Sequence, residues 1–195
     1  MNLTVDPIPK LVRTIAIPAS VGMFFQTMYN FVDTYFAGRD STAALAALTF
    51  SFPVFFLVLA FGNGLGQGTT ALMGNALGAK DLERSKRYFC QALLYCVGLT
   101  IALTVGGLCF ARQLFILQGA KEQVLEYSLQ YMNVIMSGSG FFLLQTVLNA
   151  EFNSRGNTKI YRNTLIAGFF ANCLLDPWLM YGWLGAPALG VAGLA

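Results

Sequence analysis

The sequence contains no histidine, and only 11% of its 195 residues are charged. An ordinary soluble domain has about 25% charged residues, so this composition argues against one. Histidine is the commonest general base and metal ligand, and the chain has neither an HExxH sequence nor a nucleophile placed beside a base. Its four cysteines lie in apolar runs without CxxC spacing, which disfavours a disulfide framework or a zinc site. We therefore predict that the protein is not an enzyme and has no cofactor.

Charge is also too sparse for a nucleic-acid partner. The net charge is only +3, and no basic surface interleaved with aromatics can be traced along the sequence. Hydrophobic residues make up 56% of the chain, and its uncharged runs reach the roughly 20 residues that a helix needs to cross a bilayer. We therefore predict an all-α integral membrane protein, surrounded by membrane lipid. The expected helices cover about residues 11–37, 42–73, 88–111, 127–150 and 160–183, and a sixth starts at about 188.

The distribution of basic residues predicts the orientation in the membrane. If the N-terminus is inside, nine basic residues fall on the inner side and three, Arg39, Arg112 and Lys121, on the outer side. Cytoplasmic loops of membrane proteins carry an excess of Lys and Arg. We expect a multi-pass protein of the cell inner or plasma membrane, with a cytoplasmic N-terminus.

The first apolar segment contains one acid, Asp33, at the end of a polar stripe. Gly22, Gln26, Asn30 and Asp33 follow one another at helical spacing, so they share one face of the expected helix. A carboxylate at bilayer depth costs about 2 to 3 kcal/mol on insertion scales, so it should face a bundle interior or a wet cavity. Alternatively, Asp33 lies close enough to the outer end to be solvated by headgroups. Pro18, near the helix start, predicts a kink.

Two other expected helices carry polar residues at similar spacing. Asn63 and Gln67 lie within 42–73, and Gln145 and Asn149 lie within 127–150. Together with Gln26 and Asn30 they are candidates for the lining of a cavity. The alternative role is helix packing, because weakly polar side chains often form contacts between membrane helices.

A second deeply placed acid, Asp176, lies in the fifth expected helix, four residues after Asn172. Pro177 cannot donate a backbone hydrogen bond, which frees the carbonyl of Cys173. Two carboxylates, an amide oxygen and a spare carbonyl suit a small hard cation such as Na⁺, or a shared proton. No other metal site is expected. Alternatively, the acids belong to separate networks, bonded to Asn30 and Asn172, and never meet.

Four segments, in order along the chain, resemble the multidrug and toxic compound extrusion (MATE) family of antiporters. They are PASVGMFFQTMYNFVDTYFAG, GNGLGQGTTALMGNALGAKD, NAEFNSRGNTK and NCLLDPWLMYG. The resemblance implies a fold of twelve helices in two six-helix lobes, as in other secondary transporters built from repeats. Residues 1–195 would then be most of the N-terminal transmembrane lobe, and we expect the chain to be a fragment that lacks the C-terminal lobe.

The resemblance also implies roles for individual residues. In the branch of the family that couples through its N-terminal lobe, the positions of Asp33, Asn172 and Asp176 bind Na⁺ or take up a proton, and Pro18 is the helix-one proline. The ion enters in exchange for a small organic, often cationic, substrate that leaves the cell. A further ligand comes from the sixth helix, beyond Ala195, and other branches place the site in the second lobe.

Two alternatives to multidrug efflux stay open at this point. A flippase for lipid-linked substrates of the same superfamily would be expected to have a more cationic cavity, whereas no basic residue interrupts a span of this chain. A non-transporting membrane scaffold would explain the helices but would leave the two acids without a role.

Overall fold

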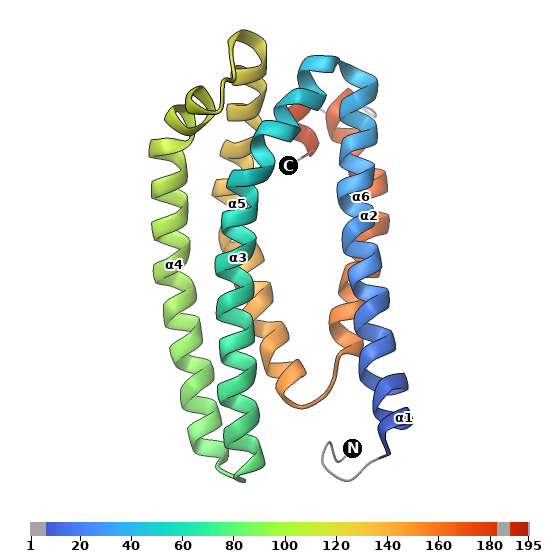
Figure 1. Ribbon diagram of the computed structural model, residues 1–195, viewed down its shortest axis with the longest axis vertical. Coiled ribbons are helices and arrows are strands. Elements are labelled where there is room, and N and C mark those ends of the chain that lie inside the picture. Colours follow the sequence, from blue (N-terminus) through green and yellow to red (C-terminus); the bar gives the residue numbers. More distant parts are fainter. Residues whose placement is uncertain (1–6, 183–187, 195) are drawn as a thin grey trace.

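The structure is a computed structural model that describes residues 7–182 and 188–194, and helices account for nearly all of them (Figure 1). Within these ranges there is no strand, so the all-α prediction is confirmed. The elements in chain order are α1 (Ile8–Leu11), the π-helix η1 (Val12–Ala16), α2 (Ile17–Asp40), α3 (Thr42–Gly78), α4 (Leu82–Leu117), α5 (Glu122–Ser154), α6 (Lys159–Tyr181) and the 3-10 helix η3 (Gly190–Leu194).

Polar residues set the ends of the long helices. Ser41 is extended between α2 and α3, and its hydroxyl oxygen accepts a hydrogen bond of 3.0 Å from the Ala44 N–H. Asp81 does the same at the start of α4, where its carboxylate accepts from the Arg84 N–H at 2.9 Å. Such caps satisfy backbone donors that have no partner inside the helix. Gly182 ends α6 in the left-handed region, at φ 70°, which glycine adopts without penalty.

The helices form two groups, which are visible in Figure 1. One consists of α3, α4 and α5, whose shared core contains Val58, Phe115 and Met132. The other is the pair α2 and α6, which run side by side. The groups meet near the turn between α2 and α3, where Ala44, Tyr131, Met180 and Val191 are buried in one cluster. This junction is the part of the fold that positions the candidate site.

Close packing inside the three-helix group depends on small residues. A Cβ atom added at Gly62 of α3 would lie 2.7 Å from the Phe142 ring of α5, and one added at Gly107 of α4 would collide with the Met136 side chain. Glycines let helix backbones approach in this way in membrane proteins. The tight contact fixes how α3, α4 and α5 sit relative to one another.

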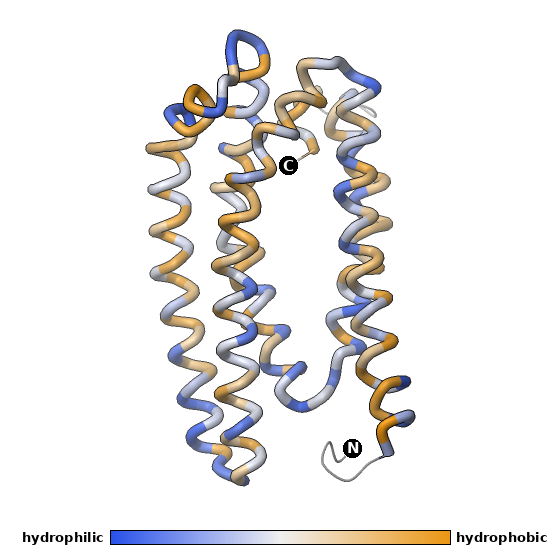
Figure 2. Tube along the Cα trace, viewed as in Figure 1, coloured by the Kyte–Doolittle hydropathy of each residue, from blue (hydrophilic) through white to orange (hydrophobic). Residues whose placement is uncertain are grey.

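Apolar side chains point outward as well as inward, which is the pattern of a protein surrounded by lipid. Phe141 is 82% exposed and Leu117 is 83% exposed, and the hydropathy colouring in Figure 2 shows hydrophobic residues along the middle of the helices. Four segments are long and apolar enough to cross a membrane: Ile8–Asp40, Thr42–Gly78, Leu82–Leu117 and Glu122–Ser154. The helix α6 runs alongside α2 and is not among these four segments.

The observed helices extend beyond the uncharged segments from which they were predicted. The segment predicted at 88–111 is α4, which starts at Leu82 and ends at Leu117, because capped and charged residues form its first turn. The fifth predicted helix, 160–183, corresponds to α6, which ends at Tyr181. Residue 183, the predicted end, lies outside the described ranges. Where a sixth helix was expected from about 188, the described residues contain the short 3-10 helix η3.

Candidate functional site

One amide joins the two buried acids. The Nδ2 atom of Asn172 donates a hydrogen bond of 3.2 Å to Oδ1 of Asp33 and another of 2.9 Å to Oδ1 of Asp176. Asn172 and Asp176 are one turn apart on α6, and Asp33 reaches them from α2. The structure therefore brings together the two acids of the sequence, and it does so through a residue that the sequence also singled out.

The site has more acceptors than donors. Asp176 is only 3% exposed, and its second oxygen, Oδ2, has no hydrogen-bond partner in the described part of the chain. The same holds for Oδ1 of Asn172. A buried acceptor without a partner is costly to a fold, because it has lost its hydrogen bonds to water. A proton or a small cation would satisfy these oxygens, since carboxylate and amide oxygens are the ligands of hard cations.

Asp33, Asn172 and Asp176 supply carboxylate and amide oxygens at this position. Among the described residues, no group of three or more His, Cys, Asp and Glu side chains lies close enough to hold a metal.

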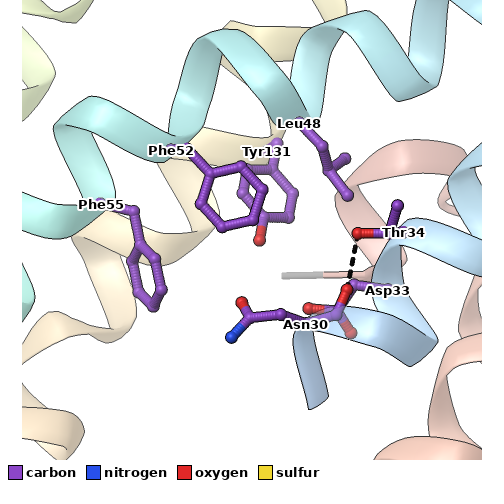
Figure 3. Close-up of a pocket in the computed structure, with 7 residues that line it drawn as sticks. All are labelled: Asn30, Asp33, Thr34, Leu48, Phe52, Phe55 and Tyr131. Atoms are coloured by element: carbon purple, nitrogen blue, oxygen red, sulfur yellow. Dashed lines mark hydrogen bonds between the residues drawn. The ribbon is translucent and has the colours of Figure 1, made fainter. Parts of the chain in front are cut away.

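A small pocket opens beside Asp33 (Figure 3). Its walls come from three helices: Asn30, Asp33 and Thr34 of α2, Leu48, Phe52 and Phe55 of α3, and Tyr131 of α5. The Thr34 hydroxyl donates to the backbone oxygen of Asn30 at 2.6 Å, so this side chain is turned back onto its own helix. In Figure 3 the polar residues of α2 face the three aromatic rings across the pocket. Asp33 thus contacts Asn172 and also lines the space between α2, α3 and α5.

Tyr29 holds α2 against α6 one turn before the bridge. Its hydroxyl donates to the Leu165 carbonyl oxygen at 3.3 Å and lies directly on Gly168, where an added Cβ would collide with it. Its ring makes an edge contact with Phe169, with centroids 6.4 Å apart. A side chain at position 168 would force Tyr29 to move, so the close contact between α2 and α6 at this level depends on glycine.

Pro18 follows a break in the regular helix. The π-helix η1 occupies Val12–Ala16, and its pattern continues to Ile17, whose N–H bonds to the carbonyl of Val12. Proline lacks an N–H and crowds the preceding turn, and π-type segments are a recognised cause of helix bending. The irregular backbone therefore lies directly before Pro18, and the kink at Pro18 stays a prediction.

The other predicted lining residues fall into two sets. Asn30 lines the pocket beside Asp33, and Gln26 lies outside that pocket and accepts a hydrogen bond of 3.2 Å from the Tyr161 hydroxyl of α6. The other four also lie outside it: Asn63 and Gln67 are exposed on α3, Gln145 is half-buried on α5, and Asn149 is buried with its Nδ2 atom unpaired among the described residues.

The aromatic wall of the pocket and the Tyr29 contact were not predicted from the sequence. Phe52 and Phe55 of α3 and Tyr131 of α5 lie on other helices than Asp33 and Asp176, and only the packing of α3 and α5 near α2 makes them neighbours of Asp33. Tyr29 did carry a signal, because it lies four residues before Asp33 in the sequence and so on the same side of the helix.

The fold and the site together define a polytopic α-helical membrane protein with an acidic, acceptor-rich site between its helices. The MatE family model matches residues 18–178, which include every residue of the bridge. The chain belongs to the MatE family.

Curated relatives have transport-related names and are longer than this chain. The chain is 29% identical over 189 residues to a FAD transporter of Shewanella oneidensis, covering 97% of the chain and 42% of that protein. It is 31% identical over 180 residues to a probable multidrug resistance protein, YoeA, of Bacillus subtilis, covering 92% and 39%. It is 26% identical to the multidrug export protein MepA of Staphylococcus aureus, covering 96% and 42%. The chain therefore spans less than half the length of these relatives.

Solved structures share the fold. An outward-facing multidrug resistance MATE family transporter of the MOP superfamily matches with a TM-score of 0.86 and 29% identity, over 95% of this chain and 41% of that one. A MOP superfamily transporter from Pyrococcus furiosus, described as having a binding pocket of reverse polarity, matches with a TM-score of 0.85 and 28% identity, covering 95% and 41%. The arrangement of helices seen in Figure 1 is thus that of one part of a larger transporter fold.

Proposed function

We propose that the full-length protein containing this chain is an antiporter that exports hydrophobic or cationic small molecules in exchange for Na⁺ or H⁺. The observation that carries the proposal is the Asn172 bridge, which holds Asp33 and Asp176 together and leaves two buried acceptor oxygens without donors. An intramembrane acid pair without a cationic partner is expected to have a functional role. Small-molecule transport is also what the names of the relatives describe.

Exchange follows from what the site can hold. An ion or proton bound between Asp33 and Asp176 would neutralise charge that is otherwise buried, and an organic cation bound elsewhere in the full-length protein would compete with it by favouring a different conformation. If the two ligands compete, each favours the conformation that binds it better, and the ion gradient then drives the substrate outward. The pocket lined by Phe52, Phe55 and Tyr131 has a volume of only about 10 Å³, which is room for a water-sized group and not for an organic cation.

Coupling is tested by imposing the two gradients separately. In proteoliposomes that contain the full-length protein, we expect transport of a fluorescent organic cation under either an inward Na⁺ gradient at symmetrical pH or an inward proton gradient without Na⁺. Dye movement is followed by fluorescence, with protein-free vesicles as the control. Dye transport that persists at full rate without either gradient would overturn the coupling, and no transport of any substrate, FAD included, would favour a scaffold.

The charge distribution supports an inner or plasma membrane location with the N-terminus in the cytoplasm. Nine basic residues lie on the side of the bundle that carries Lys10 and three on the other. The missing C-terminal lobe would supply the rest of the transporter, because the relatives extend well beyond the region that matches this chain.

A cysteine-reactive, membrane-impermeant reagent directed at Ser41→Cys, in the turn between α2 and α3, should label intact cells from outside.

A further inference from the structure

A second feature of the fold lies far from the acids. A groove of about 480 Å³ runs between α3, α4 and α5 close to the turn that joins α3 to α4. Asp33 and Asp176 lie near the other end of the bundle, since α2 and α6 both end within a few residues of them. In Figure 1 the last turn of α5 lies above the lower tips of α3 and α4, so these two helices extend past it. The groove therefore lies where α5 ends and α3 and α4 continue.

The interior of the groove is apolar. Its lining includes Met73, Leu77, Phe89, Leu148 and Phe152, and Leu148 is 44% exposed within it. Exposed apolar surface at the end of a membrane-spanning bundle is normally covered by lipid chains or by protein. This part of the groove therefore suits a hydrocarbon chain.

Two cations stand at the rim of the groove. Lys86 pairs with Glu83 at 2.9 Å, and both side chains are more than 70% exposed. Exposed pairs of this kind contribute little, so Lys86 can exchange Glu83 for another anion at small cost. Arg155 contacts Glu151 through two nitrogens, Nη2 at 2.6 Å and Nε at 2.8 Å, and both reach the same carboxylate oxygen. Its remaining N–H groups can bind a further anion, since guanidinium has five donors.

The surroundings of the groove are also basic. The α3–α4 turn, the start of α4 and the end of α5 together contain five basic and three acidic residues. The cations are Lys80, Arg84, Lys86, Arg87 and Arg155, and the acids are Asp81, Glu83 and Glu151. Basic pockets between membrane helices at such an interface attract anionic lipid headgroups.

We propose that this groove binds one anionic phospholipid, with an acyl chain on the apolar floor and the phosphate at Lys86 and Arg155. Another groove provides a contrast. It has a volume of about 610 Å³, runs along α3 and α4 past Leu65, Leu94 and Leu99, and has no charged residue in its lining. That groove can hold a hydrocarbon chain but has no group that selects a headgroup.

Photo-crosslinking locates the lipid. The full-length protein is reconstituted with a trace of diazirine-labelled phosphatidylglycerol, and the labelled peptides are mapped by mass spectrometry. We expect labelling at Leu82–Cys90 and Leu148–Arg155, displaced by unlabelled phosphatidylglycerol at concentrations well below those needed with phosphatidylcholine. Each basic side chain near an anionic surface contributes roughly fivefold in affinity, so Lys86→Gln/Arg155→Gln should remove the preference.

A matched variant and a second kind of substitution make the test decisive. Arg84 is in the same turn of α4, but its Nε donates to Tyr88 at 2.9 Å and it does not line the groove, so Arg84→Gln should keep most of the preference. The double variant Lys86→Gln/Arg155→Gln also loses the ion pair between Arg155 and Glu151, which could impair folding. Cys90→Trp keeps that pair and all charges but fills the groove, so it should reduce labelling independently. Equal displacement by the two lipids, or an unlabelled groove because a downstream segment of the protein covers it, would overturn the proposal.

Discussion

Asp33→Asn in the full-length protein is expected to abolish ion-driven efflux while leaving the protein inserted and folded. The substitution keeps the size of the side chain, and the new amide oxygen can still accept from Asn172, which lies 3.2 Å from Oδ1 of Asp33. It removes the negative charge and the proton-accepting oxygen, so an ion no longer gains a charged ligand. Because a neutral side chain at bilayer depth is cheaper than a carboxylate, insertion should not suffer. Dye efflux under the gradient that drives the parent protein is the measurement.

The control for this substitution lies on the same helix. Asp40 ends α2, is exposed and is not part of the bridge, so Asp40→Asn removes one negative charge about two turns away from Asp33. We expect it to leave gradient-driven efflux at the parent level. Asp176→Asn should match Asp33→Asn, since the two acids share one donor. Undiminished efflux in the Asp33 variant, at equal protein level, would remove the basis of the proposed mechanism.

The bridge could be anticipated because helical spacing is a strong constraint. Once Asn172 and Asp176 are on one helix, one turn apart, their side chains must share a face. An acid at bilayer depth must also avoid lipid. These two conditions make it reasonable that Asp33 and Asp176 turn toward the same interior. They do not say which donor joins them, and only the structure shows that a single amide serves both.

The rest of the site depends on relations between helices that no spacing rule contains. Asn63 and Gln67 have the periodicity of a polar stripe and are exposed on α3, whereas Leu48, Phe52 and Phe55 of the same helix face the pocket beside Asp33. The role of Asn63 and Gln67 as cavity lining stays a prediction. The register and rotation of α3 are set by contacts such as Gly62 against Phe142 of α5. Such contacts join residues far apart in the sequence, so the face that meets Asp33 could not be assigned from α3 alone.

The predicted helices were too short for a simpler reason. Absence of charge identifies the part of a helix that lies in hydrocarbon, whereas the helix itself continues into the interface. Glu83 and Lys86 are in the first turns of α4, paired at 2.9 Å, and the Asp81 cap starts the helix before them. Charged residues near an end are favourable in a helix when their sign suits its dipole.

Gly168→Ala is expected to weaken the contact between α2 and α6 and, with it, the bridge one turn further along. The new methyl group would collide with the Tyr29 hydroxyl oxygen and would lie 3.0 Å from Cζ of the same ring. Tyr29 must then move away from the Leu165 carbonyl, or the helices must separate. Overpacking of this kind costs about 1–3 kcal/mol. The measurement is the midpoint of thermal unfolding of the full-length protein in detergent, beside gradient-driven efflux.

Tyr29→Phe distinguishes this specific collision from general damage to α6. Removing the hydroxyl takes away the nearest atom that the methyl group meets, so Tyr29→Phe/Gly168→Ala should be more stable than the sum of the single effects predicts. Gly64→Ala is the matched control, because a methyl group there meets nothing within 4 Å. Strict additivity of the two substitutions would mean that Tyr29 does not set the spacing of α2 and α6. A rescue that restores both stability and efflux would show that the spacing of these helices is what lets Asn172 reach Asp33.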